Sequence, residues 1–261
     1  MATSLLERYR AFAFDLDGVV WLGGKIIPEA PAAIQAIRDA GKPLLFLSNN
    51  ASYIPFWIVE RLATGGVRVK EEEILTSASA ARAWVEREKL VGKRAFVLGA
   101  PSVIEQIDDL LEVVPVERGA EVDLVMVARD IEFTYARLAA AADAVRNGAI
   151  FVASNRDHIM PTPTGFDPGT GSVLAAIEAA SGRKAASLGK PELPMMQAAA
   201  ERLGVKGVLM IGDRPDSDVA GAHRIGWGSA VVLTGVTKPG MPLEPAPDHV
   251  LRTLADLLVP M

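Results

Sequence analysis

The sequence predicts an α/β protein with a doubly wound, mostly parallel sheet and a second α/β segment inserted into it. Three observations support this fold class. Short apolar runs recur along the chain, a segment with helical periodicity follows most of them, and polar clusters stand directly after several runs. Alternating strands and helices are typical of βαβ units, and continuous hydrophobicity is typical of strands covered on both faces.

The apolar runs define the expected strands, and the Ala-rich segments between them define the expected helices. Strands are predicted at residues 11–14, 43–47, 94–98, 122–127, 149–153, 185–188, 208–211 and 230–233. Helices are predicted at residues 30–40, 77–89, 133–147, 172–180, 193–203 and 219–225.

Four polar clusters follow predicted strands: Asp15-Leu-Asp17, Ser48-Asn49-Asn50, Gly189-Lys190-Pro191 and Gly212-Asp213. The carboxyl ends of parallel strands share one edge of a sheet, where ligands bind. We therefore expect these four separated pieces of sequence to converge at one site.

Strands in the long gap between the second and third clusters carry no comparable polar group. This gap predicts an inserted α/β domain over residues 77–185. The catalytic core would then comprise residues 1–76 plus 186–261.

Composition narrows the class of protein. The 261 residues carry a formal net charge of −5 without a Lys/Arg block, which argues against nucleic acid as a partner. The absence of cysteine excludes disulfides and thiolate catalysis and suits a cytoplasmic protein. No stretch approaches about 18 uninterrupted apolar residues, so we expect neither a signal peptide nor a membrane span.

Asp15 and Asp17 point to metal or phosphoryl chemistry. Two carboxylates this close need a cation or a shared proton to relieve their repulsion. Mg²⁺ pairs one or two carboxylates with a substrate phosphate, and a carboxylate can also be the nucleophile of an aspartyl-phosphate enzyme. The alternative is an acidic turn without a chemical function. A calcium loop fits poorly, because Val19 and Val20 occupy the places of its third ligand and its glycine.

A second acidic pair, Asp213 and Asp218, follows another predicted strand. Asp213 stands directly at the strand end and suits direct ligation of a metal, with Asp218 holding a metal-bound water. Asp216 or Ser217 could instead cap the helix that follows.

The remaining polar groups could hold phosphate. The hydroxyl of Ser48 and backbone N–H groups near Asn49 could cradle phosphate oxygens, although Ser and Asn are common in ordinary turns. Lys190 could neutralise the carboxylates and the transferring phosphoryl group, although most lysines are solvated surface charges.

In this order the clusters resemble the haloacid dehalogenase-like superfamily. The similar branch is subfamily IIA, which has a large α/β cap and includes 4-nitrophenylphosphatases, phosphoglycolate phosphatases and pyridoxal phosphate phosphatases. The resemblance covers almost the whole chain, through FDLDGVVWLGGKIIPEA, LLFLSNNAS, EEEILTSASAA, DIEFTYARL, VASNRDHIMPTPTG, PGTGSVLAAIEAASGRK, LGKPELPM, MIGDRPDSDVAGAHRIG and VVLTGVT.

The resemblance implies a Mg²⁺-dependent phosphatase that forms an aspartyl phosphate on a small-molecule monoester. It implies that Asp15 is the nucleophile and that Asp17 is the general acid and base. The metal ligands would be Asp15, the backbone carbonyl of Asp17 and Asp213, with Asp218 in the second shell around the metal. Ser48, Asn49 and Lys190 would hold the phosphate.

In the inserted segment, the resemblance places Asn155, Asp157 and His158 in a loop that faces the substrate. Gly169 to Ser172 matches the Gly-rich turn of the family between cap and core. Ala128 departs from the pattern, because many relatives have glycine there. Relatives often associate through the cap, so a homodimer is a candidate assembly.

Two other functions remain open on the sequence. A phospho-accepting aspartate switch also places acids, a hydroxyl and a lysine on a doubly wound sheet. It needs neither an acid/base at Asp17 nor an inserted cap. A catalytically inactive scaffold of this fold is the second alternative, and the complete set of polar groups argues against it.

Overall fold

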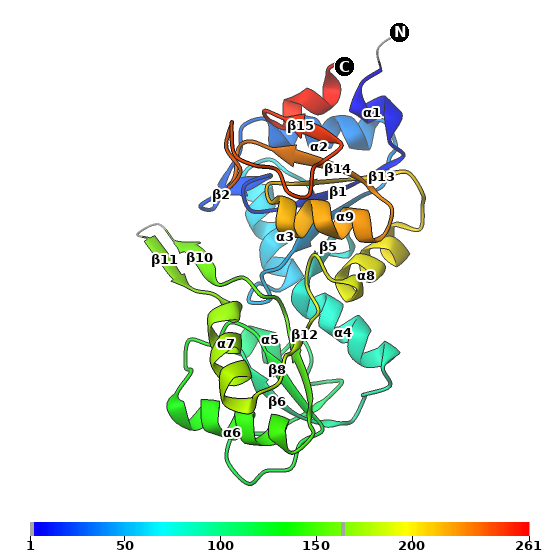
Figure 1. Cartoon of the computed structure of the whole chain (residues 1–261). Coiled ribbons are helices and arrows are strands. Elements are labelled where there is room, and N and C mark those ends of the chain that lie inside the picture. The colour runs from blue at the N-terminus through cyan, green and yellow to red at the C-terminus, as the bar shows by residue number, and fades with distance from the viewer. Residues whose placement is uncertain (1–2, 163–164, 261) are drawn as a thin grey trace. The chain divides into compact units, whose positions relative to one another are not determined.

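The structure, a computed structural model, describes residues 3–162 and 165–260 and contains two compact units (Figure 1). The first unit comprises the described parts of residues 1–48, 55–75 and 190–261, and the second comprises those of 49–54 and 76–189. The sequence VASNRDHIMPTPTG that contributed to the family resemblance includes Pro163 and Thr164, which lie outside the described residues. Among the described helices, none is long and apolar enough to cross a membrane.

The first unit is built on a six-stranded sheet with the order β15-β14-β13-β1-β4-β5. The strands are β1 (Ala11–Asp15), β4 (Leu44–Ser48), β5 (Ile74–Thr76), β13 (Val208–Gly212), β14 (Gly228–Val232) and β15 (His249–Leu251). The central strand β1 pairs in parallel with β13 on one side and β4 on the other. Asp15 at the end of β1 is in register with Leu47 of β4. This register brings the ends of the two strands to one edge, as expected for a parallel sheet.

Helices cover both faces of this sheet (Figure 1). The elements outside the sheet are α1 (Leu5–Arg8), β2 (Trp21–Leu22), β3 (Lys25–Ile26), α2 (Ala30–Asp39), α3 (Pro55–Thr64), η1 (Glu71–Glu73), α8 (Leu193–Leu203), η2 (Pro215–Val219), α9 (Ala220–Arg224) and η3 (Leu254–Leu258).

Side-chain alternation along the strands explains the two-sided covering. Phe12 and Phe14 of β1 lie in one core cluster with apolar side chains of α2 and α3. Ala13, between them, is also fully buried and faces the opposite side of the sheet. Contacts of α8 with β4 and of α9 with β14 cover the opposite face. A strand buried on both faces reads as a continuous apolar run, which is why β1 was predictable.

The second unit has its own five-stranded sheet with the order β12-β9-β8-β6-β7, in which every neighbouring pair is parallel. Its elements are α4 (Ser77–Arg87), β6 (Arg94–Leu98), α5 (Pro101–Ile104), β7 (Glu112–Val113), β8 (Leu124–Val127), α6 (Tyr135–Arg146), β9 (Ile150–Ala153), the hairpin of β10 (Ile159–Thr162) and β11 (Gly165–Pro168), α7 (Thr170–Ser181) and β12 (Ala186–Ser187).

Two core clusters, one on each face, stabilise this second sheet. Ala95 and Val97 of β6 pack with α4, whereas Phe96 and Leu98 of the same strand pack with α6 and α7. Local signals set the helix ends: the hydroxyl of Thr76 accepts a hydrogen bond from Ser79 N at the start of α4.

The α/β fold class is confirmed, because each unit carries a parallel sheet with helices on it. The sequence analysis did not predict α3, which follows β4 along the chain. The predicted strand at 185–188 exists as β12, but the expectation that it shares the sheet of β1 is wrong, because β12 pairs with β9. The domain boundaries at 76/77 and 185/186 stay a prediction.

Candidate active site

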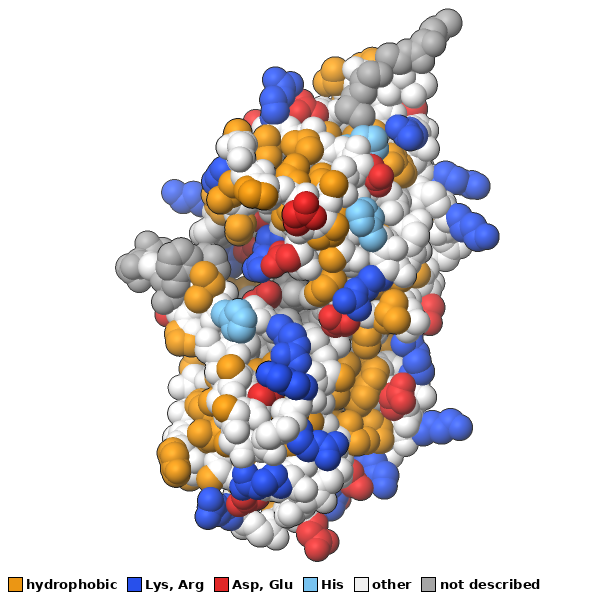
Figure 2. All heavy atoms as spheres, in the orientation of Figure 1, with side chains coloured by type: hydrophobic (Ala, Val, Ile, Leu, Met, Phe, Trp, Pro, Cys, Tyr) orange, Lys and Arg blue, Asp and Glu red, His pale blue; other side chains and the backbone are white. Residues whose placement is uncertain are grey.

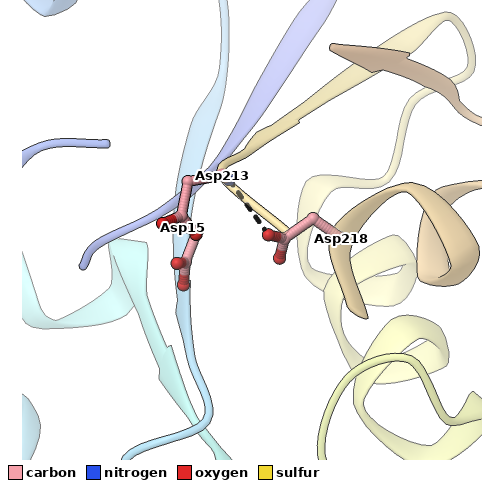
Figure 3. A group of neighbouring side chains, drawn as sticks. All are labelled: Asp15, Asp213 and Asp218. Carbon is pink, nitrogen blue, oxygen red and sulfur yellow. Dashed lines mark hydrogen bonds between the residues drawn. The ribbon is translucent and has the colours of Figure 1, made fainter. Parts of the chain in front are cut away.

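Three carboxylates meet at the end of the central strand of the first unit (Figure 3). Asp15 is the last residue of β1, Asp213 follows β13 directly, and Asp218 lies in the helical turn η2. One carboxylate oxygen from each residue lies within 4.8 Å of the other two. The convergence that the sequence predicted for Asp15 and Asp213 therefore follows from the pairing of β1 with β13.

Asp218 is held in place by backbone donors. Its Oδ2 accepts hydrogen bonds from Asp213 N at 3.2 Å and from Arg214 N at 3.1 Å, the first of which is drawn in Figure 3. The turn η2 is a π-helical turn, a feature that often occurs at functional sites. The alternative of helix capping is wrong for this turn: no side chain caps α9, and Asp216 pairs with Arg214 instead.

Three glycines leave the space that these carboxylates occupy. A Cβ at Gly18 would lie 2.3 Å from Asp213 Oδ2, and a Cβ at Gly235 would lie 1.9 Å from the same oxygen. A Cβ at Gly212 would lie 2.1 Å from the carboxyl carbon of Asp218. These distances are far below a van der Waals contact, so any side chain at these positions would displace the acids.

The loop after β14 fixes the remaining side of Asp213. Val236 N donates to Asp213 Oδ2 at 2.6 Å, and Thr237 donates to the backbone carbonyl of Asp213 through both its N–H and its hydroxyl. Thr234 of the same loop donates its hydroxyl to the carbonyl of Gly18 at 2.6 Å. On the sequence, this segment contributed only to the family resemblance, because a Thr-Gly-Val-Thr run carries no chemistry without its tertiary partners.

Lys190 lies among the carboxylates and is only 4% exposed. Its Nζ donates to Asp15 Oδ1 at 2.6 Å, to Asp218 Oδ1 at 2.7 Å and to the carbonyl of Leu47 at 3.5 Å. Lys190 is therefore not an ordinary solvated surface lysine. The strand-end argument for Lys190 was nevertheless incorrect, because the chain leaves the second unit at Gly189 and enters the first at Lys190.

The electrostatics of the cluster show an excess of negative charge. Burial raises the pKa of Asp213 to about 7, and the charge of Asp218 adds to that rise. Burial also raises the pKa of Asp15 well above its ordinary value, partly opposed by Lys190. For Lys190, burial would lower the pKa, but the charges of Asp15 and Asp218 raise it above its ordinary value. One lysine does not balance three neighbouring acids.

The donor set fits a hard divalent cation. Mg²⁺ is bound by carboxylate oxygens together with water and substrate phosphate, and Asp15, Asp213 and Asp218 provide three such carboxylates at one point. A cation there would also favour the ionised forms of acids whose pKa values are raised. The residues present are therefore those that a magnesium site needs.

Asp17 differs from the acids of the cluster because its side chain reaches the surface. Its Oδ1 accepts a hydrogen bond from Trp21 Nε1 at 2.7 Å. The surrounding protein raises the pKa of Asp17 by desolvation, while the Trp21 hydrogen bond lowers it. Trp21 was not among the predicted site residues. Its spacing of four residues from Asp17 was the only available signal.

Ser48 ends β4 and is buried at the same edge of the sheet as Asp15. Asn49, the next residue, belongs to the second unit. There its backbone carbonyl accepts from Asn155 Nδ2 at 2.7 Å, and its side-chain amide donates to Asp157 Oδ2 at 3.4 Å. His158 is exposed, and its carbonyl accepts from the hydroxyl of Ser172 at 2.7 Å. Asn49 is thus grouped with the predicted cap residues.

Comparisons with known proteins agree with this geometry. Residues 12–110 match the family described as haloacid dehalogenase-like hydrolase, and residues 187–257 match a second family of HAD-like hydrolases. The 5′-nucleotidase YutF of Bacillus subtilis is 31% identical over 235 residues, which cover 89% of this chain and 90% of the relative. An acid sugar phosphatase of Staphylococcus aureus is 32% identical over 234 residues, covering 89% of each chain.

Solved structures are similar over nearly the full length. A p-nitrophenyl phosphatase from Archaeoglobus fulgidus superposes with a TM-score of 0.87 at 30% identity, covering 96% of this chain and 98% of that one. A glycerol phosphate phosphatase from Mycobacterium tuberculosis, solved in complex with magnesium, has a TM-score of 0.88 at 29% identity and covers 99% of this chain and 79% of that one. From its sequence, its two parallel sheets and its buried acidic cluster, this chain belongs to the haloacid dehalogenase-like hydrolases, subfamily IIA, and is a phosphatase, a hydrolase of phosphoric monoesters.

Proposed function

We propose that this chain hydrolyses small-molecule phosphate monoesters with Mg²⁺, by transferring the phosphoryl group to Asp15 and then to water. The observation that carries the proposal is the buried cluster of three carboxylates with Lys190 between Asp15 and Asp218. A structural ion pair would need one acid for one lysine. Three acids at one point, at the end of a central strand, fit a site completed by a divalent cation and a phosphate.

The first chemical step uses Asp15 and Asp17. A carboxylate oxygen of Asp15 attacks phosphorus, and the bond between phosphorus and the leaving oxygen breaks. Asp17 gives its proton to that oxygen and becomes a carboxylate. In the second step Asp17 takes a proton from water, the water oxygen attacks phosphorus, and phosphate leaves with Asp15 restored.

The other residues stabilise the negative charge that develops on the phosphoryl oxygens. Lys190 donates to Asp15 and can reorient toward phosphoryl oxygens, while the hydroxyl of Ser48 and the amide of Asn49 are proposed to bind phosphate. Asp15, Asp213 and the carbonyl of Asp17 would hold Mg²⁺, with Asp218 holding a water molecule bound to the ion. When bound, the ion neutralises charge on the phosphoryl oxygens and on the nucleophile.

The substrate class is proposed from the relatives. They include a 5′-nucleotidase, acid sugar phosphatases and a glycerol phosphate phosphatase, so we expect a small polar alcohol or nucleoside as the leaving group. Figure 2 shows acidic as well as basic side chains on the face that it draws, and the formal net charge of the chain is −5. This distribution supports a small-molecule substrate rather than a nucleic acid.

Purified protein should release phosphate from several small monoesters, and only with Mg²⁺. The measurement is phosphate release from glycerol phosphate, a sugar phosphate, a nucleoside 5′-monophosphate and 4-nitrophenyl phosphate, each with Mg²⁺ and with excess EDTA. Activity in EDTA equal to that in Mg²⁺ would contradict the metal claim. A single stoichiometric phosphorylation without repeated turnover would support the aspartate switch instead.

We also propose that the second unit selects the substrate, through Asn155, Asp157 and His158. These residues offer an amide, a carboxylate and an imidazole, while the proposed nucleophile and acid belong to the first unit. Changing His158 or Asp157 to Ala should therefore alter kcat/KM unequally across the substrate panel, and least for 4-nitrophenyl phosphate, because specificity is a difference in transition-state binding. An equal loss for every substrate would assign the loop to folding or closure instead.

Two further expectations concern the whole protein. We propose a homodimer formed through the second unit, which sedimentation of the wild type can test. We propose the cytoplasm as the compartment, because a sequence without cysteine suits a reducing environment.

A further inference from the structure

We infer that Trp21 is a positioning residue for the general acid, holding one oxygen of Asp17 so that the other carries the catalytic proton. This inference rests on the proposed role of Asp17 in phosphoryl transfer. It assigns a function to a buried tryptophan that enters the sequence analysis only as part of the run FDLDGVVWLGGKIIPEA.

The hydrogen bond joins a donor buried in the core to an acceptor that reaches the surface. Trp21 is 2% exposed, so its ring is fixed by the core of the first unit, where it packs in the same cluster as Phe14. Asp17, in contrast, has an exposed side chain. Trp21 Nε1 donates to Asp17 Oδ1 at 2.7 Å. An exposed aspartate samples several rotamers, and a charge-assisted hydrogen bond from a fixed ring selects one of them.

The backbone between the two residues makes this contact possible. The carbonyl of Leu16 accepts hydrogen bonds from Val20 N at 2.9 Å and from Trp21 N at 3.1 Å, and Gly18 N donates to the carbonyl of Trp21 at 2.7 Å. The chain therefore turns back on itself within four residues. Gly18 has a φ of +79°, which glycine adopts without strain. The turn brings the indole N–H beside the carboxylate that precedes it in the chain.

The guanidinium of Arg61, in α3, lies over the ring of Trp21. Its guanidinium carbon lies 5.3 Å from the centroid of the Trp21 ring, within the range of a cation–π contact. Gly24, at a φ of +81°, leaves room for this guanidinium, because a Cβ there would lie 1.6 Å from one of its nitrogens. Arg61 thus contacts the ring of Trp21, and Trp21 in turn donates a hydrogen bond to Asp17.

The two carboxylate oxygens of Asp17 therefore have different roles in the reaction. Oδ1 is engaged by Trp21, and among the described residues no hydrogen bond reaches Oδ2. Oδ2 is therefore the oxygen that gives a proton to the leaving group in the first step and takes one from water in the second. A carboxyl free to rotate would present this proton in the required direction for only a fraction of the time.

Leaving-group chemistry separates this role from simple packing. An alkoxide leaving group, as from glycerol phosphate, needs a proton as its bond to phosphorus breaks. The 4-nitrophenolate anion is stable near neutral pH and leaves without one. A defect in the acid therefore slows alkyl esters much more than nitrophenyl esters, whereas a packing defect or a loss of metal slows both equally.

The test is Trp21→Phe, which removes the N–H donor and keeps an aromatic ring in the core. We expect kcat for glycerol phosphate to fall about tenfold, the effect of losing one hydrogen bond to a charged group, with KM nearly unchanged and kcat for 4-nitrophenyl phosphate within about twofold of wild type. Trp227→Phe is the matched control: Trp227 is 8% exposed and belongs to the same unit, and no hydrogen bond joins it to Asp17 in the described chain. It should leave the ratio of the two rates unchanged.

Asp17→Asn separates failure of this inference from failure of the proposed function. It should show the same selective loss as Trp21→Phe, and a larger one. If Asp17→Asn slows both esters equally, Asp17 is not the acid and both proposals fail. If Asp17→Asn is selective and Trp21→Phe slows both esters equally or neither of them, only the positioning role fails.

A measurement without turnover completes the test. The ¹⁵N–¹H spectrum should contain four tryptophan indole signals, one for each tryptophan in the sequence. The signal that disappears in Trp21→Phe belongs to Trp21. In Asp17→Ala this signal should move upfield, because its acceptor is gone. An unchanged position would show that the hydrogen bond does not form in solution and would overturn the inference.

Discussion

Replacing Asp15 with Asn should abolish phosphate release while the protein remains folded. Asn has nearly the same shape as Asp but is not a nucleophile toward phosphorus, so no phosphoryl intermediate can form. We expect turnover below detection for every ester, because the attacking carboxylate oxygen is missing. Wild-type protein quenched during turnover should carry phosphate on a peptide containing Asp15, and the variant should carry none.

The stability of this variant provides an independent check. Burial and the neighbouring acids raise the pKa of Asp15, so its charge is destabilised in the metal-free fold. A raised carboxyl pKa costs stability at pH values where the group is ionised. Asp15→Asn should therefore unfold in EDTA at the same temperature as wild type or higher, while the stabilisation of wild type by Mg²⁺ is reduced.

Asp39→Asn is a suitable control for Asp15→Asn. Asp39 is exposed at the end of α2, where its partner is Gln35. It should keep full activity and the full response to Mg²⁺. Residual turnover above one-tenth of wild type in Asp15→Asn would assign the attack on phosphorus to water or to another residue.

Replacing Lys190 with Met should lower both turnover and stability. Met preserves the apolar volume of the side chain but leaves Asp15 and Asp218 without their shared cation. Loss of one preorganised positive donor costs about 3 kcal/mol in the transition state, or about 10²–10³ in kcat. Breaking a buried ion pair by removing one partner costs about 3–5 kcal/mol of folding free energy.

The pH dependence of the Lys190 contribution has a defined sign. The pKa of Lys190 is raised in the fold, so its stabilisation is fully present below the pKa of free lysine, about 10, and is lost as pH rises through the folded value. Chemical denaturation of wild type and Lys190→Met near pH 7 therefore measures the whole effect. Mg²⁺ should recover part of the lost stability, because it supplies another cation to the same acids.

Lys184→Met is the matched control for Lys190→Met. Lys184 also contacts a carboxylate, that of Glu178, but 81% of its side chain is exposed. An ion pair with an exposed lysine contributes about 0–1 kcal/mol, and Glu178 keeps its hydrogen bonds from Arg156 and from Ala185 N. This variant should therefore be close to wild type in kcat and in stability. If Lys190→Met behaved in the same way, the central position of Lys190 in the site would be wrong.

Local patterns in the sequence determined the fold class and most of the acidic site. Strands such as β1 and β13 are buried on both faces, so each appears as a continuous apolar run. Because parallel strands end at one edge, Asp15 and Asp213 could be placed together before any coordinates were known.

The tertiary structure decided what depends on contacts between distant segments. No periodicity could show that β12 joins a different sheet from β1. Nor could it show that Lys190, which is 175 residues from Asp15 in the sequence, donates a hydrogen bond to it. The space left by Gly18 and Gly235 exists only when two loops meet around Asp213. The contact between Trp21 and Asp17 was not predicted, because hydrophobicity records that a ring is buried and not what its N–H faces. Burial and periodicity are properties of one segment, whereas a hydrogen bond or an excluded volume belongs to a pair of segments, and only the folded chain defines the pair.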